Sequence, residues 1–100
     1  MEISTCDLYE GSYYLLKGCE LEAIEGLRLN GTLTCRMSFT GDRLEALQLV
    51  YLQGRAEANL FEFRRTYGQL SSLVLKAKKK FKNQLKQQAQ QSPLKEGGEG

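Results

Sequence analysis

The sequence contains no histidine and no tryptophan, and its one proline stands at position 93. Without histidine, the commonest general base of enzymes is missing. The three cysteines, Cys6, Cys19 and Cys35, form no C-x-x-C pair and have no imidazole to activate a thiolate or share a zinc ion. The glycines are scattered and build no phosphate-binding loop. We therefore expect a protein that is not an enzyme, with no catalytic residues, no metal and no cofactor.

Long apolar runs are also missing. None approaches the about 18–20 residues of a membrane span, and the first ten residues, MEISTCDLYE, lack the basic and apolar regions of a signal peptide. The chain is 41% hydrophobic and 26% charged, which is ordinary for a globular protein. These features predict a cytoplasmic protein with reduced cysteines and no membrane partner.

The formal net charge of +2 conceals a strong asymmetry. Residues 1–63 hold five Lys or Arg against ten Asp or Glu, for a net charge of −5, whereas residues 64–100 hold nine against two, for a net charge of +7. Halves of opposite sign indicate contact with a polyanion or head-to-tail electrostatic association.

The first half of the chain predicts a helix followed by a β-hairpin. Ser4 and Asp7 stand at capping-box spacing before an amphipathic stretch, and Gly18 supplies the left-handed residue that ends a helix. Asn30-Gly31 is a strong signal for a two-residue type I′ turn. After this turn, apolar and polar residues alternate, which predicts a half-buried strand.

Pairing across a two-residue turn places Ile24 opposite Met37 and Glu25 opposite Arg36. The same register puts four apolar residues on the outer face of the hairpin: Leu21, Ala23, Leu27 and Leu29. Two alternatives follow. Either a bulge near Gly26 resets the register, or the outer face is covered by the long helix or by a second copy of the chain.

Two further helices follow the hairpin. Asp42 is expected to cap the first, with Glu45 three residues on, and Gly54 to end it; the second starts near Asn59. Its apolar residues then repeat at the heptad spacing of a coiled-coil seam: Leu60, Phe63, Tyr67, Leu70, Val74, Ala77 and Phe81. Five of these form the expected oligomer interface: Phe63, Tyr67, Leu70, Val74 and Phe81. The predicted fold is therefore a small α+β domain of α-β-β-α-α order, with a two-stranded antiparallel hairpin and a long C-terminal helix.

The chain divides into three expected parts. Residues 1–75 form a compact α+β domain, residues 76–91 a basic helical extension, and residues 92–100 a disordered tail that begins where Pro93 ends the helix. No later segment of the sequence remains to cover Ala77 and Phe81, so we expect the extension to project from the domain and to fray when free.

The basic segment KAKKKFKNQLK places six lysines in eleven positions. No acidic residue lies between Arg64 and Lys95, whereas a helix selected only for stability would mix in glutamates one turn away. Three explanations stay open: contact with nucleic acid, contact with an acidic protein surface, or plain solvation of the helix end. The expected nucleic-acid-binding residues are Lys76, Lys78, Lys79, Lys80, Lys82, Lys86, Arg64 and Arg65.

Three tyrosines in the first helix, Tyr9, Tyr13 and Tyr14, are also candidates. Two alternatives stay open: they stack on nucleic-acid bases, or they lie in the core or at its rim. Tyrosines on a helix beside a small sheet are more often core or rim residues. Lysines contact phosphates as point charges without reading bases, so binding is expected to be non-specific.

Several short motifs support a resemblance. They are an opening Asp-Leu-Tyr, a Leu-Leu-x-Lys-Gly helix end and a Tyr-Leu-x-Gly helix end, made here by Asp7, Leu8, Tyr9, Leu15, Leu16, Lys17, Gly18, Tyr51, Leu52 and Gly54. Over residues 3–75 the chain resembles a small bacterial and phage domain family known as domain of unknown function 5659. The resemblance implies an α-β-β-α-α order and a bacterial or mobile-element setting, and it carries no catalytic residues. The basic segment after Leu75 lies outside it.

Together these features predict a non-enzymatic accessory binding module that contacts nucleic acid non-specifically through its basic C-terminal helix. Two alternatives stay open. One is a homo-oligomerising structural or adaptor protein, in the simplest case a homodimer, that pairs through the heptad seam. The other is a phage or mobile-element inhibitor that binds a host protein through its acidic N-terminal half, with Glu20, Glu22 and Glu25 as contacts.

Overall fold

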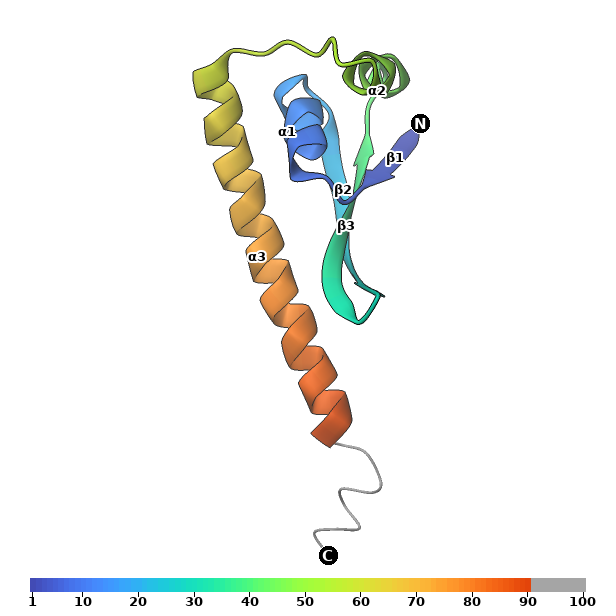
Figure 1. The fold of residues 1–100 in the computed structure, drawn as a ribbon, viewed down its shortest axis with the longest axis vertical. Helices are drawn as coiled ribbons and strands as arrows, with labels where there is room; N and C mark the ends of the chain where they lie inside the picture. Colours follow the sequence, from blue (N-terminus) through green and yellow to red (C-terminus); the bar gives the residue numbers. More distant parts are fainter. Residues whose placement is uncertain (91–100) are drawn as a thin grey trace, which may run out of the picture.

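The computed structural model describes the backbone of residues 1–90 and the side chains of residues 1–87. The elements follow in the order β1 (Glu2–Thr5), α1 (Leu8–Leu16), β2 (Glu20–Leu29), β3 (Thr32–Thr40), α2 (Leu44–Leu52) and α3 (Leu60–Gln90). The strands form one antiparallel sheet of order β1-β3-β2. The domain is α+β, and α3 runs along the length of the molecule beside α1 and the hairpin (Figure 1).

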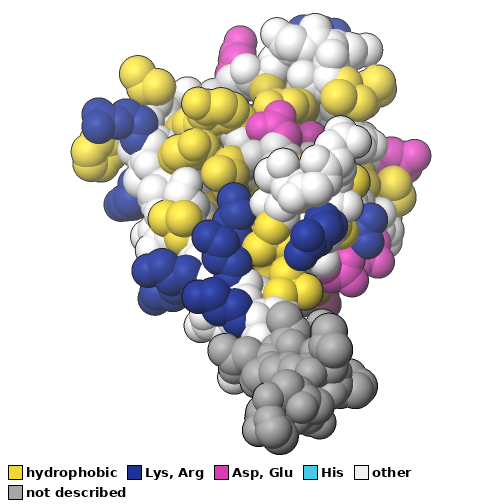
Figure 2. Space-filling view, turned by 60° about the horizontal axis from the view of Figure 1, so that its bottom comes forward, with side chains coloured by type: hydrophobic (Ala, Val, Ile, Leu, Met, Phe, Trp, Pro, Cys, Tyr) yellow, Lys and Arg dark blue, Asp and Glu magenta, His cyan; other side chains and the backbone are white. Residues whose placement is uncertain are grey.

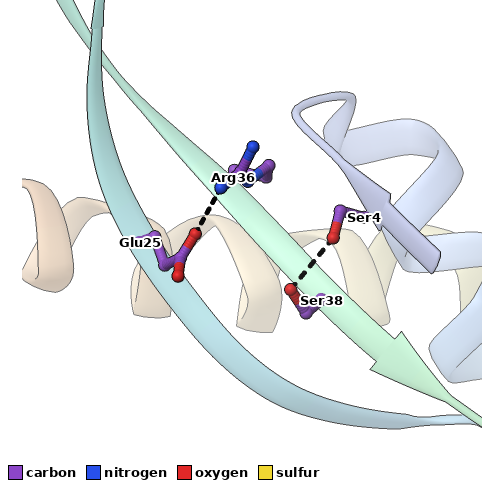
Figure 3. A network of polar contacts seen from close by, with 4 residues as sticks. All are labelled: Ser4, Glu25, Arg36 and Ser38. Atoms are coloured by element: carbon purple, nitrogen blue, oxygen red, sulfur yellow. Dashed lines mark hydrogen bonds and ion pairs between the residues drawn. The ribbon is translucent and has the colours of Figure 1, made fainter. Parts of the chain in front are cut away.

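The sheet has three strands where the sequence predicted two. The additional strand β1 pairs with β3, and its Ile3 lies opposite Phe39 in the core. Ser4, expected to cap the first helix, belongs to this strand, and its hydroxyl lies 3.1 Å from that of Ser38 (Figure 3). Asp7 caps α1 instead, because its carboxylate accepts a hydrogen bond from the Tyr9 amide at 2.9 Å.

The hairpin turn and its register are confirmed. Asn30 and Gly31 both have positive φ, at 52° and 80°, as a type I′ turn requires. Glu25 lies opposite Arg36, and the two side chains form an ion pair with a 2.7 Å N···O distance (Figure 3). The predicted pairing matches because Asn-Gly favours a two-residue turn, and a two-residue turn determines which flanking residues lie opposite one another.

A bulge does reset the register, but it lies between Leu21 and Ala23 rather than near Gly26. Its effect is to turn Leu21 toward the core, where it packs beside Phe39. The outer face, which carries the Glu25–Arg36 pair, lies opposite the face that α3 covers (Figure 3), so coverage of the outer face by the long helix is wrong. Leu29 stays 53% exposed on that open face.

The core lies between the sheet and the pair of helices α1 and α3 (Figure 1). Tyr14, Phe39 and Leu70, from α1, β3 and α3, are each fully buried. Gly11 permits this close packing, because a Cβ there would stand 2.9 Å from the Phe39 ring and 3.1 Å from Leu70. The three elements therefore meet at one glycine of α1.

α2 contributes a buried pair, Leu44 and Leu47, at one end of the sheet near α1 and β1. Gly54, with φ of 74°, ends the turn after this helix as predicted. The expected cap is wrong, because Arg43 rather than Asp42 occupies the N-cap position and no side chain caps the helix. At α3 the prediction is confirmed, since the Asn59 side chain accepts a hydrogen bond from the Glu62 amide at 3.0 Å.

α3 is continuous across residue 75. The expectation that nothing covers its later apolar residues is wrong: Ala77 and Phe81 are half-buried, and the Phe81 ring lies directly against Gly26 of β2. The hairpin precedes α3 in sequence but packs against its later turns, and it covers the Phe81 side chain. The division into residues 1–75, 76–91 and 92–100 stays a prediction, and its last part lies outside the described residues.

Candidate nucleic-acid interface

The lysine-rich segment forms turns of α3 that lie beside the hairpin. Five of its lysines are exposed and one, Lys78, is half-buried beside Cys35; the exposed ones are Lys76, Lys79, Lys80, Lys82 and Lys86. From Lys76 to Lys86 the helix rises about 15 Å. Figure 2 shows Lys and Arg side chains gathered in the lower part of the view, where this end of α3 comes forward.

Helical periodicity distributes these lysines over three sides of α3. Because Leu70 points into the core, Lys79, Lys82 and Lys86 face away from the domain. The remaining three lie on the two flanks: Lys76 and Lys80 on one, Lys78 on the other. The fourth side holds Ala77 and Phe81, which are half-buried, and Phe81 packs on Gly26 of the hairpin. The helix thus presents cationic groups wherever the hairpin does not cover it.

No carboxylate in the part of the chain with described side chains pairs with these lysines. Within residues 1–87 the single ion pair joins Arg36 to Glu25 on the outer face of the sheet, away from α3. The only acidic residue of α3 is Glu62 in its first turn. The lysines therefore repel one another within a short span, and any polyanion that binds them removes this repulsion.

Arg64 and Arg65 lie apart from the lysines. Both are exposed near the beginning of α3, about 17 Å before Lys76 along the helix axis. The outward positions between them and the lysines are uncharged, for example Gly68 and Leu75. The structure thus groups the six lysines and places the two arginines at a second location on the same helix.

The heptad seam faces this chain's own domain. Leu70 is fully buried among core residues, and five other seam residues are half-buried: Phe63, Tyr67, Val74, Ala77 and Phe81. Leu60, at the start of the seam, is 73% exposed. Pairing of two chains through the seam stays a prediction. It would use the same face of α3 that already packs against α1 and the hairpin of its own chain.

The three candidate tyrosines separate into two classes. Tyr13 and Tyr14 are buried in the core, whereas Tyr9 is 58% exposed. The Tyr9 ring stacks on Tyr67 with centroids 5.0 Å apart. The sequence pattern placed Tyr67 in the seam but carried no signal that it meets Tyr9, because the packing of α1 on α3 creates that contact.

A buried carboxylate, Glu10, is fully paired within the domain. It accepts hydrogen bonds from the Thr5 hydroxyl at 2.8 Å and from the Tyr14 hydroxyl at 2.5 Å. Burial, followed by the hydrogen bond to Glu10, raises the pKa of Tyr14 above its usual value. In the part of the chain with described side chains, no buried polar side-chain atom lacks a partner. We read this group as a structural link between β1 and α1.

The cysteines and acidic residues build no metal centre in the part of the chain that the structure describes, where no three such side chains come together. Cys6 is exposed and Cys19 and Cys35 are buried, and all three are free. Burial raises the pKa of the Cys19 and Cys35 thiols, so both stay protonated beyond the ordinary range of a thiol.

No family model matches this chain, and neither does any curated protein or solved structure. The resemblance to domain of unknown function 5659 accordingly stays an expectation drawn from short motifs. Among the helices of residues 1–90, none is both long and apolar enough to cross a membrane.

Proposed function

We propose that this protein is a non-enzymatic binding module whose helix α3 holds the phosphate backbone of a nucleic acid. The observation that carries the proposal is the group of five exposed lysines on one helix that have no carboxylate partner within residues 1–87. Lysine side chains contact phosphates as point charges and release counterions from the polyanion, which supplies most of the free energy of non-specific binding.

The arrangement supports backbone contact rather than sequence reading. The lysines occupy the outer side and both flanks of one helix, so their charges can follow a strand of phosphates along about 15 Å. Specific contacts to base edges in a duplex favour bidentate Arg, Asn or Gln side chains presented to a groove. Both arginines of α3 lie at its other end, and the two amide side chains among the lysines, Asn83 and Gln84, are outnumbered by the phosphate-binding cations.

The proposal is tested by fluorescence anisotropy with a labelled oligonucleotide at several salt concentrations. If four to six lysines each neutralise one phosphate, the logarithm of the association constant falls with the logarithm of salt with a slope of magnitude roughly 3–6. Binding that is absent at about 50 mM salt, or that does not change with salt, would overturn the proposal.

Two triple variants of equal charge change make the test specific. The test variant neutralises the three outward-facing lysines: Lys79→Gln, Lys82→Gln and Lys86→Gln. The control variant neutralises three exposed cations on other parts of the fold: Lys17→Gln, Arg43→Gln and Arg55→Gln. We expect the test variant to reduce the slope by about 3 and the control to leave it nearly unchanged. Equal losses in both would show that only net charge matters and would contradict a site on α3.

A further inference from the structure

A group of aromatic rings lies near the beginning of α3, where α1 packs against it. The Tyr9 ring stacks on the Tyr67 ring with planes 20° apart, and it lies 6.4 Å from the Phe63 ring with planes 14° apart. We name Tyr9, Phe63 and Tyr67 the aromatic platform. The Phe63 and Tyr67 rings each lie within 20° of the Tyr9 plane, and Tyr9 is the most exposed of the three rings.

The platform is open to solvent. Tyr9 is 58% exposed, whereas Tyr13 and Tyr14 of the same helix are buried in the core. Leu60 and Arg64 complete an open hollow of about 490 Å³ beside the three rings. Tyr9 thus contributes to an accessible surface rather than to the core, and a cation lies at its border.

The platform and part of the lysine surface lie on the same flank of α3. Tyr67 and Lys78 are eleven residues apart, close to three turns at about 3.6 residues per turn, so they share a flank, and the outward-facing Lys82 borders this flank one turn after Lys78. Arg64 lies about one turn before Tyr67 on this flank. A ligand that follows the flank meets a cation, an aromatic surface and then further cations.

We propose that the aromatic platform receives an unpaired base, so that the nucleic acid bound along α3 is single-stranded. This inference rests on the proposed function, because the lysines must hold the phosphates of the same strand. In a duplex the flat faces of the bases are stacked on one another, whereas in a single strand they are free to stack on tyrosine. Arg64 at the border of the hollow adds a cation for the phosphate next to the stacked base.

The carboxylates of an acidic protein segment could also pair with the lysines, but such a segment has no flat bases to stack on the aromatic rings. A basic track combined with aromatic rings is the arrangement by which proteins bind single strands without sequence preference. The observations therefore favour single-stranded nucleic acid, and a protein ligand becomes an outcome of the test.

The first measurement uses a fluorescent base-stacking probe in the full chain. The protein has no tryptophan, so Tyr9→Trp introduces a single indole at the platform. We expect oligodeoxythymidine to quench this fluorescence, and an abasic oligomer of equal length to bind without quenching. Leu52→Trp, at an exposed position of α2, is the matched control and should show no quenching with either oligomer.

The second measurement compares affinities by anisotropy. Oligodeoxythymidine should bind at least about fivefold more tightly than the abasic oligomer, and more tightly than a duplex of equal length. Tyr9→Leu keeps an apolar side chain on Tyr67 but removes the ring, so it should abolish this preference while leaving abasic binding unchanged. A thermal melt of the variant confirms that its fold is intact.

The outcomes separate the two proposals. Two outcomes overturn the platform inference and leave the phosphate-binding function standing. One is salt-dependent binding of all three ligands with equal affinity. The other is a Tyr9→Leu variant that still prefers oligodeoxythymidine to the abasic oligomer as strongly as the wild type does. Failure to bind any oligomer overturns both. Binding of an acidic polypeptide such as polyglutamate more tightly than oligodeoxythymidine also overturns the inference, because charge alone would then explain the ligand.

Discussion

Phe81 and Gly26 lie in direct contact across the interface between α3 and the hairpin. A Cβ at Gly26 would stand 2.6 Å from Cδ2 and 2.8 Å from Cγ of the Phe81 ring, closer than real side chains approach. The absence of a side chain at Gly26 is therefore what lets the Phe81 ring approach β2 this closely. Because Phe81 stands among the lysines, this contact also holds the basic turns of α3 against the domain.

We expect Gly26→Ala to destabilise the protein. The added methyl group forces the Phe81 ring out of its position, and overpacking of this kind typically costs about 1–3 kcal/mol. Alanine also reduces the conformational freedom of the unfolded chain, which offsets about 0.4–1 kcal/mol, so the middle of these ranges gives a net loss of about 1 kcal/mol. Urea denaturation measures it, and hydrogen exchange should show faster opening of residues 76–86.

Gly68→Ala is the matched control, because nothing lies within 4 Å of a Cβ at Gly68. This glycine stands inside α3, where alanine has the higher helix propensity, so the variant should be stabilised by up to about 1 kcal/mol. Destabilisation by both substitutions, or by neither, would contradict the packing described for Phe81.

Local signals in the sequence predicted much of the fold, and long-range contacts account for what they missed. Asn30-Gly31 dictates a turn from its own backbone preferences, so the hairpin and its pairing could be predicted. The strand β1 has four residues and one buried side chain, Ile3, and no periodicity can identify so short a segment. Ser4 stood at capping distance from Asp7, which favoured a helix start over a strand.

The candidate site divides in the same way. The exposure of the lysines could be predicted, because charged side chains on a helix stay in water unless they are paired. The partner of Phe81 could not, since its contact with Gly26 joins residues that are distant in sequence. Tyr9 and Tyr67 likewise meet only after α1 packs on α3. Heptad spacing alone does not distinguish a helix that packs on its own domain from one that pairs with a second chain.

Asp7 and Asp42 provide a test of the capping assignment, since both stand at capping-box spacing in the sequence and only Asp7 caps a helix. Asp7→Ala should destabilise the protein by about 0.5–2 kcal/mol, because the Tyr9 amide loses its acceptor. The Tyr51 hydroxyl, 3.0 Å from the Asp7 carboxylate, also loses its partner. Chemical denaturation of the two single variants measures the difference.

The control in this pair is Asp42→Ala, which should change stability by less than about 0.5 kcal/mol because Asp42 is exposed. Asn at position 7 should recover most of the loss, since an asparagine side chain caps helices nearly as well as an aspartate. A similar loss for both alanine variants would argue against a specific cap at Asp7.

Alkaline pH should weaken the fold through two tyrosines. Burial, followed by a hydrogen bond to Asp7, raises the pKa of Tyr51 to about 12, and burial also raises the pKa of Tyr14. In the unfolded chain both hydroxyls ionise near the ordinary value of about 10. The stabilisation from the protonated tyrosines is complete below about pH 10, and the contribution of Tyr51 is lost as pH rises from about 10 toward 12.

The measurement is the urea midpoint of the wild type and of Tyr51→Phe at pH 8, 10 and 11. Phenylalanine cannot ionise, so in the variant this position does not contribute to the loss of folding stability at alkaline pH. The variant also lacks the hydrogen bond from the Tyr51 hydroxyl to Asp7. The stability advantage of the wild type at pH 8 should therefore shrink at pH 10 and shrink further at pH 11. The difference between the two proteins cancels every pH-dependent contribution that they share. Parallel stability curves over this range would show that Tyr51 ionises alike in the folded and unfolded chains.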